Sequence, residues 1–329
     1  MNTWDVFGHD WAVEMLQQHV AHGTLRHAYL FTGPEGVGRR TIATRLAQSL
    51  NCLQPTSAGV PCRSCRTCRQ IEAGQHPDLM VVRRLADKKD LAIDQIREVS
   101  KFLSLKPYMA AYKIVLILNF EDANANSQNA LLKTLEEAPS FAVLLLTVNN
   151  AEQLLPTIIS RCEIMRLRPL STLAVDEFLQ LKGVHAEKAS LLAHLSGGRP
   201  GYALQLSTSE QDLSFRAEKL DDLHTLLSAK LPDRFHYVEG MIKDKEVFRQ
   251  TLTIWLSYWR DVLLETSGAQ VELTNIDRKD EIESLVYSID RPQARAITVA
   301  LEKAIDRLDR NVNARLLGEV TLLDWPRLK

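Results

Sequence analysis

Residues 28–41 read AYLFTGPEGVGRRT and determine how the first part of the chain folds. An apolar run, Ala28–Phe31, precedes a glycine-rich turn, which is followed by a segment with helical spacing. The turn contains Gly33, Gly36 and Gly38. Glycine lets backbone N–H groups face an anion, and the N-terminus of a helix adds partial positive charge. The stretch therefore predicts a strand, a phosphate-binding loop and a helix, in that order.

Similar apolar or β-branched runs recur further along the chain, with helical segments between them. Four of these runs are also expected to be strands, namely Leu79–Val82, Ile114–Leu118, Ala142–Val148 and Glu163–Arg168. The segments between them repeat apolar residues every three or four positions, as helices packed on a sheet do. Strands that alternate with helices predict a parallel sheet covered by helices.

The strand signals stop after Pro169, and the rest of the chain shows helical spacing only. Two short helices are expected before the turn at residues 197–201, because its glycines and proline end the second of them. The sequence then predicts a bundle of helices up to the last residue. We therefore expect three domains: an α/β domain over 1–169, a small helical domain over 170–208 and an all-helical domain over 209–329.

The composition is that of an ordinary globular protein and excludes several functional classes. The chain has 329 residues, 45% of them hydrophobic, and a formal net charge of -1. No apolar run approaches the roughly 18 residues of a membrane-spanning helix, and the N-terminus lacks the basic and apolar regions of a secretory signal. We expect no membrane association and a cytoplasmic location. The near-zero charge also argues against binding nucleic acid by bulk charge alone.

The phosphate loop lacks the groups that nucleotide hydrolysis normally requires. A Walker A loop has lysine at the position of Arg39 and serine or threonine at the position of Arg40. A guanidinium differs in size and shape from an ammonium group, and Arg40 cannot bind a cation. Thr41 is one residue out of register. We therefore expect no hydrolysis at this degenerate nucleotide site, which comprises Gly33, Gly36, Gly38, Arg39 and Thr41.

The acidic pair that would hold magnesium and orient water is also displaced. An ATPase carries these carboxylates at the end of a strand, whereas the strand here ends in Leu118 and Asn119. Glu121 and Asp122 come a few residues later. They could restore the chemistry only if the strand were shifted, so an active ATPase with an atypical site is the alternative interpretation.

Four of the five cysteines form a cluster with the spacing of a metal site. The cluster has the pattern C-x9-C-x2-C-x2-C and comprises Cys52, Cys62, Cys65 and Cys68. In a reducing compartment, four such thiolates usually close a tetrahedral structural zinc site. We expect a zinc module over residues 52–68, with an iron–sulfur cluster or unliganded thiols as the alternatives. Cys162, which has no paired base in the sequence, is expected to be a packing residue.

Four short stretches carry a family signature. They are residues 26–34 (RHAYLFTGP), 93–98 (IDQIRE), 129–139 (NALLKTLEEAP) and 155–162 (LPTIISRC). Together they resemble the bacterial clamp-loader subunits of the AAA+ family, and the resemblance spans most of residues 5–206. It implies an AAA+ P-loop-type domain with an inserted zinc module and a small helical lid domain. By analogy alone, the C-terminal helices would form an oligomerising collar domain.

Within that family, the resemblance favours a non-hydrolysing subunit of the DNA polymerase III clamp loader. The motor subunits, called gamma and tau, keep the lysine, the hydroxyl residue and the acidic pair that this sequence lacks. Aligning Lys113 and Asn129 with the family pattern places the usual Asp and Glu at Leu118 and Asn119. Arg199 lies one residue early for a motor's sensor arginine, so we expect no nucleotide role for it. The chain would then be a component of a DNA polymerase holoenzyme without ATPase activity of its own.

The motif Ser160-Arg161-Cys162 is similar to the family motif whose arginine reaches into a neighbouring subunit's ATP site. A guanidinium beside the γ-phosphate stabilises the charge that develops during transfer, and supplying it in trans makes hydrolysis depend on assembly. The resemblance therefore implies a catalytic role in trans for Arg161. It also implies gamma or tau and delta subunits as partners, with the sliding clamp and primed DNA reached through the complex.

A third interpretation is a zinc-dependent module that binds nucleic acid. Arg63, Arg66 and Arg69 interleave with the cysteines and could contact phosphates, although clustered charge more often only solvates a surface. Such a module would show salt-dependent DNA affinity in the isolated chain. The near-neutral total charge makes this the weakest of the three interpretations.

Overall fold

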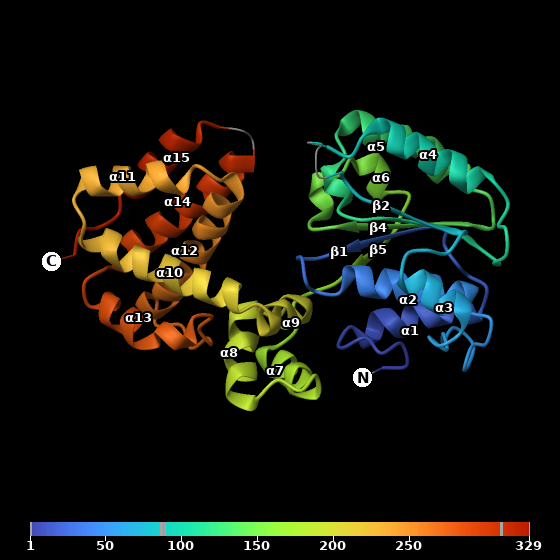
Figure 1. Cartoon of the computed structure of the whole chain (residues 1–329), viewed down its shortest axis with the longest axis horizontal. Coiled ribbons are helices and arrows are strands. Elements are labelled where there is room, and N and C mark those ends of the chain that lie inside the picture. The colour runs from blue at the N-terminus through green and yellow to red at the C-terminus, as the bar shows by residue number, and fades with distance from the viewer. Residues whose placement is uncertain (1, 86–87, 89, 310–311, 329) are drawn as a thin grey trace. The chain divides into compact units, whose positions relative to one another are not determined.

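The structure, a computed structural model, describes residues 2–85, 88, 90–309 and 312–328 of the chain. It divides into two compact units (Figure 1). The sheet unit comprises residues 1–178 and 198–202, and the helical unit comprises residues 179–197 and 203–329. The predicted change from an α/β architecture to an all-helical one is confirmed. The finer division into three domains, at residues 169 and 208, stays a prediction.

Five strands form one parallel sheet in the order β2-β3-β4-β1-β5. Their bounds are β1 Ala28–Thr32, β2 Leu79–Val82, β3 Lys113–Ile117, β4 Ala142–Val148 and β5 Glu163–Arg166. All five were predicted, because buried parallel strands read as continuous apolar runs. Every residue of β1, β3 and β4 is buried, as expected for central strands. The predicted α/β architecture, a parallel sheet with flanking helices, is confirmed.

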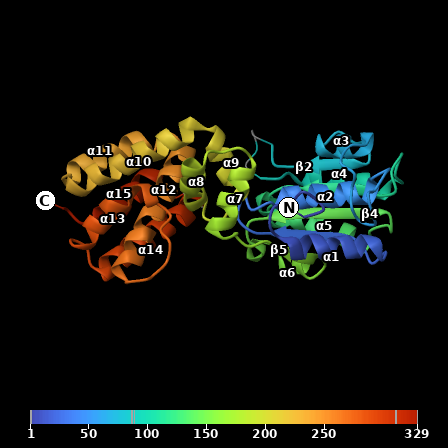
Figure 2. The same cartoon turned by 90° about the horizontal axis from the view of Figure 1, so that it is seen from below.

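Helices cover both faces of the sheet (Figures 1 and 2). One face carries α1 (Asp10–Ala21), α2 (Arg39–Asn51) and α3 (Arg66–Glu72), and the other carries α4 (Ile93–Ser104), α5 (Ala125–Glu136) and α6 (Pro156–Ile159). Successive side chains of a strand point to opposite faces. Tyr29 and Phe31 of β1 therefore enter one apolar core, and Ala28 and Leu30 enter the other.

The described residues after β5 form helices and no further strand. These helices are α7 (Thr172–Leu181), α8 (Ala186–Ser196), α9 (Pro200–Thr208), α10 (Glu210–Ser228), α11 (Leu231–Met241), α12 (Lys245–Thr266), α13 (Lys279–Val286), α14 (Arg291–Asp309) and α15 (Ala314–Leu323). Trp255 and Trp259 of α12 are fully buried and contact Trp325, with ring centroids 5.0 and 5.8 Å from it. Within the described part of the chain, no helix is both long and apolar enough to cross a membrane.

A buried carboxylate fixes the register of the strand that leads to the displaced acidic pair. Asp78, just before β2, is fully buried, and its carboxylate accepts hydrogen bonds from the backbone N–H groups of Tyr108, Met109 and Ala110 at 2.7 to 3.0 Å. The ammonium group of Lys113 lies 3.2 Å away. Burial raises the pKa of Asp78, but these donors outweigh it and hold the pKa below its usual value. Asp78 therefore fixes the start of β3 beside β2.

A second buried charge, Arg234 on α11, joins distant parts of the helical unit. Arg234 is 2% exposed, and within the described residues its guanidinium donates only to main-chain oxygens. The acceptors lie near the ends of α10 and α15 and belong to Leu226, Leu227, Leu322, Trp325 and Pro326. Because the last carbonyls of a helix have no partner within it, Arg234 acts as a C-terminal cap for two helices at once.

Replacing Arg234 with methionine is therefore expected to destabilise the chain by about 3 to 5 kcal/mol. The main-chain oxygens of Trp325 and Pro326 lose their donor, and three other carbonyl groups lose one of theirs. Denaturant unfolding would show this as a lower midpoint with an unchanged slope. The control is Arg295→Met on α14, an exposed arginine, which should change stability by no more than about 0.5 kcal/mol. Equal midpoints for the two variants would contradict the capping role of Arg234.

Candidate functional site

The phosphate loop lies between β1 and α2, as predicted, and its glycines are sterically required. Gly33, Gly36 and Gly38 have φ angles of 150°, 82° and 113°, which residues with side chains rarely adopt. A Cβ atom on Gly33 would lie 2.2 Å from the main-chain oxygen of Leu167. A Cβ atom on Gly36 would lie 2.8 Å from the main-chain nitrogen of Tyr202. The loop therefore packs tightly against the backbone that follows β5 and the backbone of α9.

The first turn of α9 lies directly against the middle of the loop. The backbone N–H of Gly201 donates to the main-chain oxygen of Gly36 at 2.8 Å. Gly201 is also sterically required, since a Cβ atom there would lie 2.9 Å from the same oxygen. The Arg199 guanidinium stacks over the ring of Tyr202 at 4.4 Å and interacts electrostatically with Glu35 of the loop. This protein contact occupies one side of the loop.

Arg39, at the position of the Walker lysine, is buried. Its side chain is 6% exposed, and Nη2 donates to Oδ1 of Asn119 at 3.4 Å. Nη1 has no hydrogen-bond partner among the residues that the structure describes. Burial lowers the pKa of Arg39, against the opposing effect of the nearby charges of Glu121 and Glu35. The guanidinium therefore extends toward the carboxyl end of β3.

The turn after β3 accounts for the displacement of the acidic residues. Asn119 adopts a left-handed conformation with φ of 50°, which asparagine tolerates better than most residues. Its backbone N–H donates to Oγ1 of Thr147 on β4 at 2.9 Å. A single turn of 3-10 helix, η1 (Phe120–Asp122), follows directly. The strand therefore ends in an amide side chain, and the two carboxylates lie on a separate turn.

The two displaced carboxylates point to different partners. Glu121 accepts a hydrogen bond from the backbone N–H of Asn149 at 3.0 Å, and burial raises its pKa while the charge of Arg39 lowers it. Asp122 instead pairs with Arg84 at 3.3 Å. Of these two carboxylates, Glu121 interacts electrostatically with Arg39 of the loop, whereas Asp122 is paired with Arg84.

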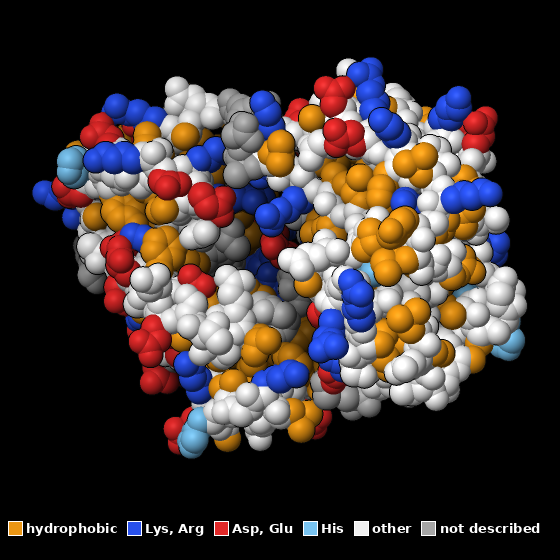
Figure 3. Space-filling view, turned by 45° about the vertical axis from the view of Figure 1, so that its right-hand side comes forward, with side chains coloured by type: hydrophobic (Ala, Val, Ile, Leu, Met, Phe, Trp, Pro, Cys, Tyr) orange, Lys and Arg blue, Asp and Glu red, His pale blue; other side chains and the backbone are white. Residues whose placement is uncertain are grey.

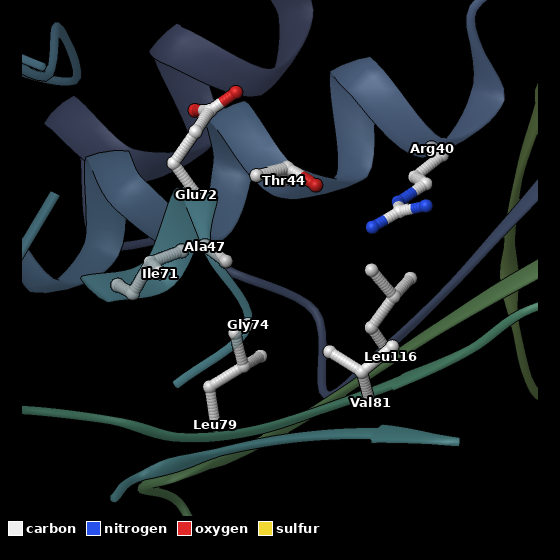
Figure 4. Close-up of a pocket in the computed structure, with 9 residues that line it drawn as sticks. All are labelled: Arg40, Thr44, Ala47, Ile71, Glu72, Gly74, Leu79, Val81 and Leu116. Atoms are coloured by element: carbon white, nitrogen blue, oxygen red, sulfur yellow. The ribbon is translucent and has the colours of Figure 1, made fainter. Parts of the chain in front are cut away.

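Arg40 and Thr41 do not join Arg39. Figure 4 shows the Arg40 guanidinium directed toward Leu116 and Val81, in a pocket between α2, α3 and the edge of the sheet. Thr41 is exposed and makes no side-chain hydrogen bond within the described part of the chain. The structure thus brings together the three glycines and Arg39, and the degeneracy of the nucleotide site stays a prediction.

The four clustered cysteines converge as predicted. Their Sγ atoms all lie within 4.8 Å of one another, and four Zn–S bonds of ~2.3 Å would place the sulfurs ~3.8 Å apart. Backbone N–H groups of Cys62, Cys65 and Cys68 point at the sulfurs of Cys52, Cys62 and Cys65 at 3.3 to 3.4 Å. The hydrogen bond from the Cys65 backbone lowers the pKa of Cys62 to about 6, whereas burial raises the pKa of Cys52 and of Cys68. The donor set fits a structural zinc ion, and the identity of the metal stays a prediction.

A buried polar network, which the sequence analysis missed, joins the cluster to α2. The Gln48 amide donates to the main-chain oxygen of Cys68 and to Glu72, both at 2.8 Å. Arg45 donates to Gln48 at 2.8 Å and to the main-chain oxygen of Trp4 at 3.0 Å, and it also pairs with Glu72. The only sequence signal was two polar residues three positions apart on the buried side of a helix. This network anchors the cysteine module on the helix that follows the phosphate loop.

The arginines between the cysteines lie on the surface of the module. Arg63 pairs with Asp5, and Arg66 and Arg69 are exposed. Figure 3 shows basic and acidic side chains interspersed over the face that it displays. Neither observation indicates that these arginines bind nucleic acid and do not simply face solvent.

Arg161 lies just beyond the end of α6 with its side chain 36% exposed. Nη1 donates to the main-chain oxygen of Thr157 at 3.1 Å and contacts Oγ of Ser160 at 3.4 Å. Nη2 lies 2.7 Å from Oε1 of Glu136, at the end of α5. The neighbouring Cys162 packs against the core, and burial raises its pKa to about 12. Arg161 is thus a surface arginine with a defined position, and its trans role stays a prediction.

The known proteins that this chain resembles are all subunits of DNA polymerase III in the comparisons that follow. The family described as "DNA polymerase III, delta subunit" matches residues 8–171. The DNA polymerase III subunit delta′ of Bacillus subtilis is 30% identical over 315 residues, which is 94% of each chain. The delta′ subunit of Pseudomonas aeruginosa is 39% identical over 183 residues, 55% of each chain. The DNA polymerase III subunit tau/gamma of Haemophilus influenzae is 34% identical over 175 residues, 53% of this chain and 25% of that protein.

These matches agree with the geometry of the sheet unit. The phosphate loop, the five-stranded sheet and Arg161 all lie within the residues that the family covers. Similarity to a delta′ subunit continues through the helical unit to 94% of both chains. The resemblance drawn from the four short stretches is therefore confirmed, and this chain belongs to the delta′ family of bacterial DNA polymerase III clamp-loader subunits.

Proposed function

We propose that this chain is a clamp-loader subunit that does not hydrolyse ATP and instead supplies Arg161 to the ATP site of a neighbouring motor subunit. The observation that carries the proposal is the burial of Arg39, which is 6% exposed and extends toward Asn119. A motor needs a cation there that reaches the terminal phosphates. Arg39, which occupies that position, instead donates a hydrogen bond to Asn119 of this chain.

Two further features support an inactive site of its own. The carboxylates that would hold magnesium and orient water are separated, because Asp122 pairs with Arg84 and only Glu121 stays near the loop. The backbone hydrogen bond from Gly201 to Gly36 sets the first turn of α9 against the loop. Phosphoryl transfer depends on positioning and charge stabilisation more than on covalent chemistry. A site whose cation is buried beside Asn119 and whose two carboxylates are separated has little with which to catalyse it.

Arg161 has the properties that a residue acting in trans requires. It is about one-third exposed, it follows a short helix, and its guanidinium is already oriented by neighbouring groups. A guanidinium placed beside the γ-phosphate of a neighbour would stabilise the charge that develops in the transition state. Hydrolysis at that site would then require this chain to be in place, so ATP use would be restricted to the assembled complex.

The partners of this chain follow from the same proposal. Its relatives include subunits named tau/gamma and delta′, so gamma or tau and delta subunits are its expected neighbours. The sliding clamp and primed DNA would be reached through that complex. The cysteine module would hold a structural zinc ion, and the C-terminal helices would provide the oligomerising collar. The degenerate nucleotide site would not hydrolyse ATP. It comprises Gly33, Gly36, Gly38, Arg39 and Thr41.

Steady-state ATP hydrolysis by the purified chain alone tests whether its own site is inactive. With magnesium, and with or without primed DNA, phosphate release is expected to equal the rate without protein, because no lysine or metal ligand is available. Turnover above that background, abolished by Arg39→Ala or Glu121→Gln, would instead establish the alternative, an atypical ATPase. Removal of Arg161 from the assembled complex tests the role in trans.

A further inference from the structure

Among the residues that the structure describes, Glu136 is the one partner of Arg161 that comes from outside the end of α6. The Thr157 and Ser160 contacts come from the turn that leads into Arg161, whereas Glu136 ends α5. Nη2 of Arg161 lies 2.7 Å from Oε1 of Glu136, the shortest of the three contacts. We propose that Glu136 is the positioning residue of Arg161, which it holds ready for the neighbour's ATP site. The inference rests on the proposed function of Arg161.

The need for such a residue follows from the flexibility of arginine. A partly exposed arginine loses much side-chain freedom when it is fixed beside a ligand, and that loss opposes the transition state unless it has already occurred. The local contacts to Thr157 and Ser160 both involve Nη1 and restrain only one end of the guanidinium. The contact to Glu136 restrains Nη2. Two restraints at different nitrogens define the plane of the group, which one restraint does not.

The helix that carries Glu136 also positions the helix that carries Arg161. Gln128, a buried residue of α5, accepts a hydrogen bond from the backbone N–H of Leu155 at 2.8 Å. Leu155 directly precedes α6, and Arg161 directly follows its C-cap. Contacts from α5 are therefore made at both ends of α6, by Gln128 at the start and Glu136 at the end. The position of the guanidinium is thereby fixed relative to α5, and through α5 relative to the sheet.

The pair is too weak to withhold Arg161 from a phosphate. Its side chains are 36% and 51% exposed, and ion pairs at such exposure change an equilibrium constant by about fivefold or less. A guanidinium carries five N–H donors, and the three contacts named above leave two of them for an anion. Arg161 can therefore bind a γ-phosphate while it keeps Glu136, or leave Glu136 at small cost. The expected effect of losing Glu136 is slower hydrolysis.

The test uses the reconstituted complex of this chain with its motor and delta subunits. Single-turnover ATP hydrolysis is followed, and the phase that disappears in Arg161→Ala is assigned to the neighbouring site. Glu136→Ala is expected to slow that phase about fivefold with an unchanged amplitude and unchanged ATP affinity, because the arginine remains but is less ordered. Glu136→Gln keeps an oxygen acceptor and should slow the phase by less, about threefold. Gel filtration checks that assembly is unchanged.

Two matched variants make the result decisive. Glu137→Ala removes the adjacent carboxylate, which is exposed and belongs to no ion pair within the described part of the chain, and should leave the phase unchanged. In the Arg161→Ala background, Glu136→Ala should have no further effect, since its role depends on the arginine. If the phase is unchanged or faster in Glu136→Ala, or if Glu136→Ala and Glu137→Ala slow it equally, Glu136 does not position Arg161. The proposed function of Arg161 would still stand. If Arg161→Ala removes no phase, the proposed function itself fails.

Discussion

Arg161→Ala is expected to eliminate hydrolysis at one ATP site of the assembled clamp loader and to leave the other sites active. An arginine supplied to a phosphoryl-transfer site typically accelerates hydrolysis by a factor on the order of 10³ to 10⁵. Without it, the affected site would hydrolyse no detectable ATP in the time that the other sites need for one turnover. Single-turnover phosphate release should show this as a lost phase. Total turnover should fall by the share of that one site.

Assembly should be unaffected by the same substitution. The Arg161 side chain is partly exposed, and the contacts of its guanidinium are with Thr157, Ser160 and Glu136 of this chain. Loss of one such surface pair changes stability by about 1 kcal/mol or less. The control is Arg166→Ala, an exposed arginine of β5, which should leave every phase intact. Equal kinetics for Arg161→Ala and Arg166→Ala would contradict the proposed role of Arg161 in the neighbour's ATP site.

Replacing Cys65 with serine should abolish zinc binding and unfold the module around it. Structural zinc sites in small peptides bind with apparent free energies of about 10 to 16 kcal/mol, and this energy is folding energy for the module. A serine hydroxyl stays protonated at neutral pH, so the remaining three sulfurs would leave the tetrahedron open. Native mass spectrometry should find one zinc ion per chain in the parent protein and none in the variant. Thermal unfolding should occur at a lower temperature.

Cys162→Ser is the matched control, because Cys162 lies outside the cluster and packs beside α6. It should retain one zinc ion per chain. Acidification should release the metal from the parent protein, since protons compete for the thiolates. Full zinc occupancy in the Cys65→Ser variant would contradict the four-ligand site. Iron in place of zinc would support the iron–sulfur alternative.

Features that depend on neighbouring residues in the chain could be predicted from the sequence. Buried parallel strands such as β4 are apolar at nearly every position, Thr147 being the exception in β4, so they were recognisable with their bounds. The cysteines were recognisable because metal ligands on one short segment have a fixed spacing. The glycines of the phosphate loop were recognisable because the loop needs them between a strand and a helix.

Features that depend on distant segments could not be predicted. The acceptors of Arg234 include residues 88 to 92 positions away, and no periodicity records such a pairing. The donors to Asp78 lie 30 to 32 positions further along the chain. The separation of Glu121 from Asp122 depends on a left-handed Asn119, which the sequence permits but does not require. These arrangements are settled by tertiary packing alone.

The contact between Gly36 and Gly201 also constrains which substitutions the chain can accept. Neither glycine can acquire a side chain alone, because each would meet the other segment's backbone within 3 Å. The two backbones are also joined by a hydrogen bond, so a change at one position requires a compensating shift in the other segment. Although 165 residues apart in the sequence, the two positions are therefore expected to vary together among related chains.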